Sequence, residues 1–115
     1  MKTLLVATLM LAGAGAIAAA DITGTWSASV VLDAGSGIAT LTLKQTGDAV
    51  TGTYMGTLGE AKVAGTVKGN QVELSFDGGP AGKITFTGTM DGASKFKGSC
   101  EYGLLGKGTF TAEKK

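Results

Sequence analysis

Most of this chain consists of short runs in which every second residue is apolar. In residues 71–76, for example, Val72, Leu74 and Phe76 alternate with polar residues. Successive side chains of a β-strand point to opposite faces, so a period of two predicts strands with one buried and one exposed face. After residue 20 the sequence lacks the 3.6-residue period of an amphipathic helix. The alternation therefore predicts an all-β fold.

Clusters of Gly, Asn and Asp separate the runs, and these residues tolerate the positive φ of tight hairpins. The predicted connections include residues 33–37 and 59–60. Eight strands are predicted, at residues 22–31, 38–45, 49–58, 61–67, 71–76, 83–90, 95–102 and 107–112. Short connections favour an eight-stranded antiparallel up-and-down meander. Since no helix is available to cover the apolar face, we expect the meander to close into a small β-barrel, with a β-sandwich as the alternative.

A short unit, Gly followed by Thr or Ser and then a larger residue, recurs along the predicted strands. Examples are Gly52-Thr53-Tyr54 and Gly108-Thr109-Phe110. Alternation places each Gly on the apolar face, and this mixture of small and large residues suits the tight interior of an eight-stranded barrel. We expect the large apolar residues to be buried on one common face. Its largest predicted members are Trp26, Leu41, Tyr54, Leu74, Phe86, Phe96 and Phe110.

The N-terminal segment shows the features of a secretory signal peptide. A basic residue precedes the apolar stretch 4–11, and the small residues 18–20 satisfy the pattern of a cleavage site. We predict cleavage before Asp21, so that residues 1–20 are a signal peptide and residues 21–115 form a single β-barrel domain. The protein is then exported, and we expect it in the periplasm or the extracellular medium.

The net charge of the mature chain limits the classes of partner that it is expected to bind. Once Lys2 is removed with the signal peptide, nine lysines balance nine acidic residues, and the chain has no Arg or His. Nucleic-acid binders normally carry a basic excess that includes Arg, so we expect no nucleic-acid partner. Membrane β-strands need about 9–11 residues, and most predicted strands are shorter. We therefore expect a domain that is not membrane-embedded after cleavage. Other partners, including a second copy in a homo-oligomer, stay open.

Catalytic machinery is not recognisable in the sequence. Without His, nucleophilic catalysis of the Ser-His or Cys-His kind is excluded, and the residue sets that bind zinc are missing. The acidic residues fall in predicted turns or on the outward face, which indicates turn formation and solubility and not paired-carboxylate catalysis. Each Gly-rich loop offers a single carboxylate, too few for calcium. We predict that the protein is not an enzyme and uses no cofactor or metal.

Cys100 is the only cysteine, so the chain cannot form an internal disulfide. Its position in the alternation is inward, between Gly98 and Tyr102. We expect a buried structural thiol, and an intermolecular disulfide is the alternative.

Two resemblances can be stated. Residues 41–53, which read LTLKQTGDAVTGT, and residues 65–72, which read GTVKGNQV, resemble a recurrent bacterial exported β-meander domain to which no activity is generally assigned. That resemblance covers most of residues 21–115 and implies hairpin architecture and export.

The second resemblance is to the avidin family, through Ile22-Thr23-Gly24-Thr25-Trp26, Val50-Thr51-Gly52-Thr53-Tyr54 and Gly108-Thr109-Phe110-Thr111. It implies an eight-stranded antiparallel barrel, with Tyr54 where the family places a tyrosine that contacts biotin. Three positions at which the family has polar biotin partners are apolar or Gly here. They are Ala28, Leu32 and Gly56. The resemblance thus implies the architecture without biotin as the ligand.

These observations predict an exported, non-catalytic β-barrel module that acts in binding or interaction. One alternative is a structural protein with a filled core, and another is a carrier of a small apolar ligand inside the barrel. A pocket of about 300 Å³ or more would favour the carrier. The candidate ligand-binding residues in the barrel interior are Trp26, Tyr54, Phe86 and Phe110.

Overall fold

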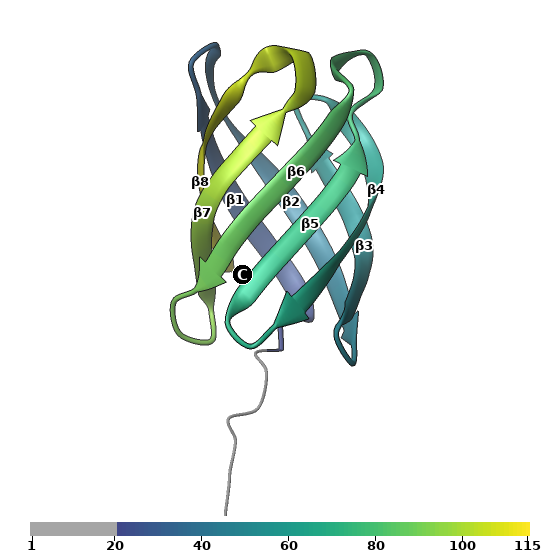
Figure 1. The fold of residues 1–115 in the computed structure, drawn as a ribbon, viewed down its shortest axis with the longest axis vertical. Helices are drawn as coiled ribbons and strands as arrows, with labels where there is room; N and C mark the ends of the chain where they lie inside the picture. Colours follow the sequence, from purple (N-terminus) through teal and green to yellow (C-terminus); the bar gives the residue numbers. More distant parts are fainter. Residues whose placement is uncertain (1–20) are drawn as a thin grey trace, which may run out of the picture.

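A computed structural model describes residues 21–115, so the predicted signal peptide, residues 1–20, lies outside the described residues. The fold is a closed antiparallel barrel in which each strand pairs with the next and β1 pairs with β8 (Figure 1). The predicted all-β meander barrel is confirmed, and the chain does not split into the two sheets of a sandwich. The strands are β1 (Gly24–Leu32), β2 (Gly35–Thr46), β3 (Ala49–Gly56), β4 (Gly59–Lys68), β5 (Gln71–Asp77), β6 (Lys83–Met90), β7 (Lys95–Tyr102) and β8 (Lys107–Lys114).

Two predicted connections are wrong in their bounds. The first turn is Asp33-Ala34 and not residues 33–37, because Gly35, Ser36 and Gly37 pair with the end of β1. Backbone hydrogen bonds need no side chains, so a Gly-rich segment can still extend a strand. The turn between β3 and β4 is Thr57-Leu58, ahead of the predicted residues 59–60.

The turn between β2 and β3 and the turn between β4 and β5 fall where the sequence predicts them. Gly47 and Gly69 begin two-residue turns with φ of +62° and +59°, in the left-handed region that Gly adopts without steric cost.

The apolar face of every strand points into the barrel. All seven of the residues predicted as the largest core members are buried, and Trp26 and Phe96 are completely so. Every Asp and Glu among residues 21–115 is exposed. In β5, for example, Val72, Leu74 and Phe76 are buried, whereas Glu73 between them is exposed and Ser75 is half-buried. The predicted common buried face is therefore confirmed.

Glycines on the inward face let neighbouring strands approach closely. A side chain at Gly52 would overlap the backbone carbonyl oxygen of Thr42, and one at Gly65 would overlap that of Glu73. The same relationship holds at Gly98 and Gly108. These glycines belong to the recurrent Gly-Thr/Ser unit, so the unit marks places where the sheet coils too tightly for any side chain.

Two 3₁₀ helices, η1 (Gly79–Ala81) and η2 (Gly103–Leu105), lie in the β5–β6 and β7–β8 connections. We call the end that carries them, with the Asp33-Ala34 and Thr57-Leu58 turns, the open end; it is uppermost in Figure 1. Within residues 21–115, no helix has the length and apolar character needed to cross a membrane.

Candidate ligand-binding site

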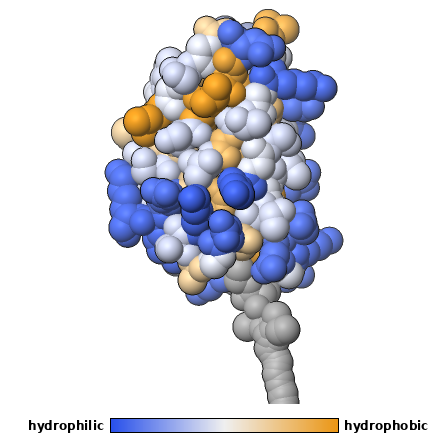
Figure 2. All heavy atoms as spheres, turned by 90° about the vertical axis from the view of Figure 1, so that its left-hand side faces the viewer, coloured by the Kyte–Doolittle hydropathy of each residue, from blue (hydrophilic) through white to orange (hydrophobic). Residues whose placement is uncertain are grey.

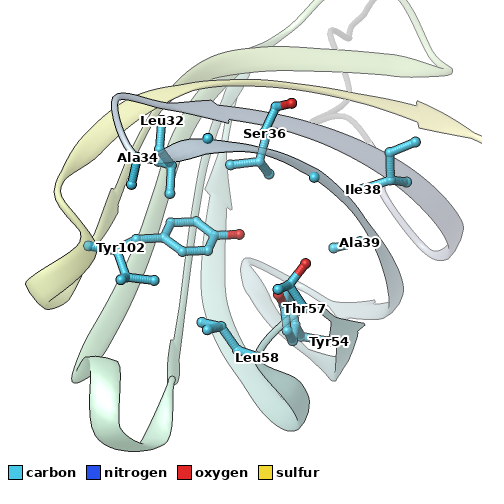
Figure 3. A pocket seen from close by; sticks show the side chains of 13 residues that line it. Leu32, Ala34, Ser36, Ile38, Ala39, Tyr54, Thr57, Leu58 and Tyr102 are labelled. Atoms are coloured by element: carbon cyan, nitrogen blue, oxygen red, sulfur yellow. The ribbon is translucent and has the colours of Figure 1, made fainter.

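A cavity of about 250 Å³ lies at the open end of the barrel (Figure 3). Its walls come from the ends of β1, β2, β3 and β7, the two turns that join β1 to β2 and β3 to β4, and η2. The lining residues are Val30, Leu32, Ala34, Gly35, Ser36, Gly37, Ile38, Ala39, Tyr54, Thr57, Leu58, Tyr102 and Leu105.

Small residues on one side of the barrel create this space. Ala34, Gly35, Gly37 and Ala39 follow one another along the first hairpin and line the cavity. Elsewhere large side chains fill the barrel. The interior therefore stays unfilled where the small side chains of this hairpin leave room beside large ones from other strands.

Tyr54 reaches the cavity from β3, where alternation directs it inward. Its ring stacks on Phe76, with centroids 4.3 Å apart and an interplanar angle of 24°. Only 2% of the residue is exposed. A Cβ atom at Gly56 would lie 2.6 Å from the Tyr54 hydroxyl oxygen, so the absent side chain of Gly56 makes room for the phenol.

Tyr102 reaches the same cavity from the last position of β7, immediately before η2. Figure 3 shows its ring extending across the opening, with the hydroxyl directed toward the side where Tyr54 and Thr57 lie. Burial raises the pKa of the Tyr102 phenol, and the charge and hydrogen-bonding interaction of the Tyr54 hydroxyl raise it further. The Tyr102 phenol therefore stays protonated at any physiological pH.

The two phenols, which we call the tyrosine pair, provide the buried polar groups of the cavity. Within residues 21–115, no hydrogen bond joins either hydroxyl to a group outside the pair. The other side-chain hydroxyls of the lining, on Ser36 and Thr57, belong to exposed residues. None of the lining residues carries a charge. The site is thus apolar and uncharged, and its buried side-chain hydrogen-bonding groups are the two hydroxyls of the tyrosine pair.

Exposed apolar side chains surround the mouth of the cavity. Ile38 and Leu105 line it while 68% and 41% exposed, and Leu104 of η2 is 86% exposed. Val31 and Met55 are the other large exposed apolar residues near this end. Figure 2 shows apolar side chains gathered in the upper part of one face and hydrophilic ones dominating the lower part. Exposed apolar surface therefore lies beside the cavity at this end of the barrel.

Of the four predicted ligand-binding residues, the structure brings Tyr54 to the cavity. Trp26 lies toward the other end of the barrel, where its indole Nε1 donates to the carbonyl oxygen of Ile22 at 2.9 Å. Its ring packs edge-on against Phe96, with centroids 4.7 Å apart. Phe86 and Phe110 pack against each other with centroids 4.7 Å apart. These three side chains form the packed core below the cavity.

Ring contacts link the cavity to that core. From Tyr54 they pass through Phe76 to Phe86, whose ring also neighbours that of Tyr102 at a centroid distance of 5.8 Å. Phe110 then connects Phe86 to Phe96. Tyr54 and Tyr102, the aromatic residues of the cavity lining, are therefore held by ring contacts with the core, which pre-organises the site.

Several site residues were not predicted. Alternation places Tyr102 on the inward face, but nothing in its own strand indicates that it lines the same cavity as Tyr54. Leu58 is the last residue of the predicted strand 49–58, where alternation places it inward, but it was not predicted as a site residue. Leu105 lies in a connection, where alternation gives no information, and its signal is an apolar residue in a turn otherwise rich in Gly.

Cys100 is buried as predicted, with 2% of the residue exposed and no disulfide partner. Burial raises the pKa of its thiol, although a backbone hydrogen bond from Gly108 acts in the opposite direction. The thiol therefore belongs to the core. Among residues 21–115, no three His, Cys, Asp or Glu side chains are grouped so that they could hold a metal ion.

Fold and cavity together define a small closed barrel with an apolar site at one end. Among solved structures, the chain is similar to a redesigned β-barrel, mFAP1, whose structure was determined bound to DFHBI. The similarity has a TM-score of 0.56 at 15% sequence identity and covers 82% of this chain and 94% of that one. At this identity the similarity supports the barrel fold alone. No known family, and no curated protein, matches the sequence.

Proposed function

We propose that this protein is an exported, non-catalytic carrier that binds a small apolar molecule in the cavity at the open end of the barrel. The observation that supports this most is the cavity itself, a space of about 250 Å³ whose uncharged lining includes two buried tyrosines. Ligand sites are typically apolar clefts with a few placed polar groups. The cavity has that composition, although its volume of about 250 Å³ is below the roughly 300 Å³ expected of a carrier.

Two further observations are consistent with the carrier. The exposed apolar side chains of Ile38 and Leu105 line the cavity, which favours the entry of an apolar molecule. A barrel of the same fold, mFAP1, holds DFHBI. The proposal that the protein acts outside the cytoplasm depends on the signal-peptide pattern of residues 1–20.

The non-catalytic part of the proposal follows from the side chains available. The chain has no His, the acidic groups of residues 21–115 are all exposed, and Cys100 is in the core. The tyrosine pair at the cavity lacks a neighbouring base that could activate it.

A structural protein without a small-molecule site is the second candidate. The filled interior around Trp26, Phe86 and Phe110 favours it, since core packing alone accounts for those residues. The two candidates differ in whether the cavity at the open end takes up a ligand.

A titration with naphthalene, followed by NMR of the backbone amides, separates these candidates. The carrier predicts saturable shifts centred on residues 32–39 and 54–58. Ala39→Leu should abolish the shifts, because Ala39 is buried and lines the cavity, so that a larger side chain occupies the ligand space. Thr40→Leu is the matched control, since position 40 faces outward on the same strand. Absence of shifts in the wild-type protein would favour the structural candidate.

A further inference from the structure

We infer that the ligand of this cavity is a neutral molecule of one to two rings that presents one hydrogen-bond acceptor to the tyrosine pair. This inference rests on the proposed function and adds the chemical class of the ligand. It follows from the size of the cavity, the charge of its lining and the number of hydrogen-bond donors that the pair contains.

The volume of the cavity limits the number of rings that the ligand can contain. An enclosed apolar cavity of about 150 Å³ is large enough for benzene. The present cavity, at about 250 Å³, exceeds that, and the ring of Tyr54, which stacks on Phe76 behind it, forms part of its wall. A flat aromatic or quinone-like ring system can lie against such a wall with offset or edge-to-face contacts. Long acyl chains would extend beyond the cavity into water.

The lack of charged side chains in the lining disfavours a ligand that is ionised inside the cavity. A buried carboxylate or ammonium group needs an opposite charge or several hydrogen bonds, because the loss of its hydration is otherwise uncompensated. The lining has no charged side chain, and every Asp and Glu among residues 21–115 is exposed. A fatty acid or an amine would therefore have to keep its charged group at the mouth, away from the buried phenols.

The tyrosine pair determines the polar group of the ligand. Two phenols carry two O–H protons, and an interaction between the two hydroxyls uses at most one of them. Within the described residues neither hydroxyl has a hydrogen-bond partner beyond the pair, although Tyr54 is 98% and Tyr102 95% buried. At least one of the two donors therefore has no acceptor within the described residues, and a carbonyl or ether oxygen of a ligand in the cavity can supply one.

Three probes with the same ring system test this inference: naphthalene, 2-acetylnaphthalene and 2-naphthoate. We expect 2-acetylnaphthalene to bind about 3- to 10-fold more tightly than naphthalene, as one net hydrogen bond predicts. We expect 2-naphthoate to bind at least about tenfold more weakly than the ketone, since its charge lacks a partner. Dissociation constants from NMR titration of the wild-type protein give both ratios.

Variants of the tyrosine pair assign the preference to its hydroxyls. Tyr54→Phe and Tyr102→Phe each leave one O–H donor in the cavity, so each single variant should still prefer the ketone over the hydrocarbon. The double variant has no donor there, and its two dissociation constants should become equal within about twofold. Unchanged naphthalene binding by the double variant would show that its cavity is intact.

The outcomes distinguish this inference from the proposed function. Equal binding of ketone and hydrocarbon by the wild-type protein, or tightest binding of 2-naphthoate, would overturn the inferred ligand class while the carrier stands. A ketone preference that persists in the double variant would overturn the role of the tyrosine pair. Binding of none of the three probes would overturn the carrier itself.

Discussion

The phenolic oxygen of Tyr54 occupies the space into which a side chain at Gly56 would project. A Cβ atom at Gly56 would lie 2.6 Å from that oxygen and 3.0 Å from the Cβ atom of Ala39. The stacked ring of Phe76 holds Tyr54 from another side. The small residue at position 56 therefore allows the hydroxyl to reach the cavity.

This relationship predicts the effect of Gly56→Ala. The added methyl group displaces a buried, stacked tyrosine, and we expect the free energy of unfolding to fall by about 1–3 kcal/mol, as is typical of overpacking. Gly37→Ala at the same end is the control, since its Cβ would meet only the Thr57 hydroxyl, at 3.2 Å. Urea unfolding of both variants provides the comparison. Equal stability of the two would show that Tyr54 is not confined by position 56.

Phe86 is the centre of the aromatic core, within 6.0 Å of the ring centroids of Phe76, Tyr102 and Phe110. Phe86→Ala should lower the free energy of unfolding by about 3–5 kcal/mol. Leu104→Ala, at a position that is 86% exposed, should change it by less than about 0.5 kcal/mol. A loss under about 1 kcal/mol for Phe86→Ala would contradict the inward placement of the apolar face.

The thiol of Cys100 should be unreactive in the folded protein. It is buried, and burial raises its pKa, so little thiolate is accessible at neutral pH. A chromogenic disulfide reagent should react slowly with the native protein and rapidly in guanidinium chloride. The variant S99C/C100A, whose thiol lies on the exposed face, is the control for an accessible thiol. Rapid labelling of native wild-type protein, or a disulfide-linked dimer on a non-reducing gel, would support the intermolecular alternative.

Tyr102 should make stability depend on alkaline pH. Burial raises its pKa above the ordinary value of 10.0, so above that pH the unfolded chain loses the proton first. The unfolded state then binds fewer protons than the folded state, and the free energy of unfolding decreases as the pH rises. The stabilising effect is complete below pH 10 and is lost above it. Tyr102→Phe should therefore unfold with a shallower pH dependence between pH 9 and 12, measured by thermal denaturation.

Processing supplies an independent prediction. The secreted form should begin at Asp21, because the small residues at 18–20 satisfy the cleavage pattern. The intact mass of protein recovered from the periplasm or medium measures this directly. Retention of residues 4–11 in that mass would contradict both the cleavage and the proposed export.

The fold could be predicted from the sequence because a period of two is a local signal. Val72, Leu74 and Phe76 identify the inward face of one strand without reference to any other strand. The Gly-rich start of β2 could not be predicted in this way. Gly35 and Gly37 have no side chain to alternate, and their place in the strand depends on pairing with Leu32 and Val30.

The cavity could be predicted only in part, because it depends on residues that meet across the barrel. Alternation places Tyr54 and Tyr102 inward, but their meeting depends on how far β3 and β7 extend toward the same end. The space beside them depends on the small side chains of Ala34 and Ala39, which read in sequence as ordinary turn and strand residues. Trp26, the most prominent interior residue in the sequence, lies toward the opposite end.

Native mass spectrometry of the protein purified from the periplasm or medium of its own cells tests the central claim most directly. The carrier predicts a fraction of molecules heavier than the 21–115 polypeptide by one small neutral molecule, which is released on denaturation and absent from Ala39→Leu. The mass of the bare polypeptide alone, in wild-type and variant alike, would contradict the claim that the barrel carries a ligand.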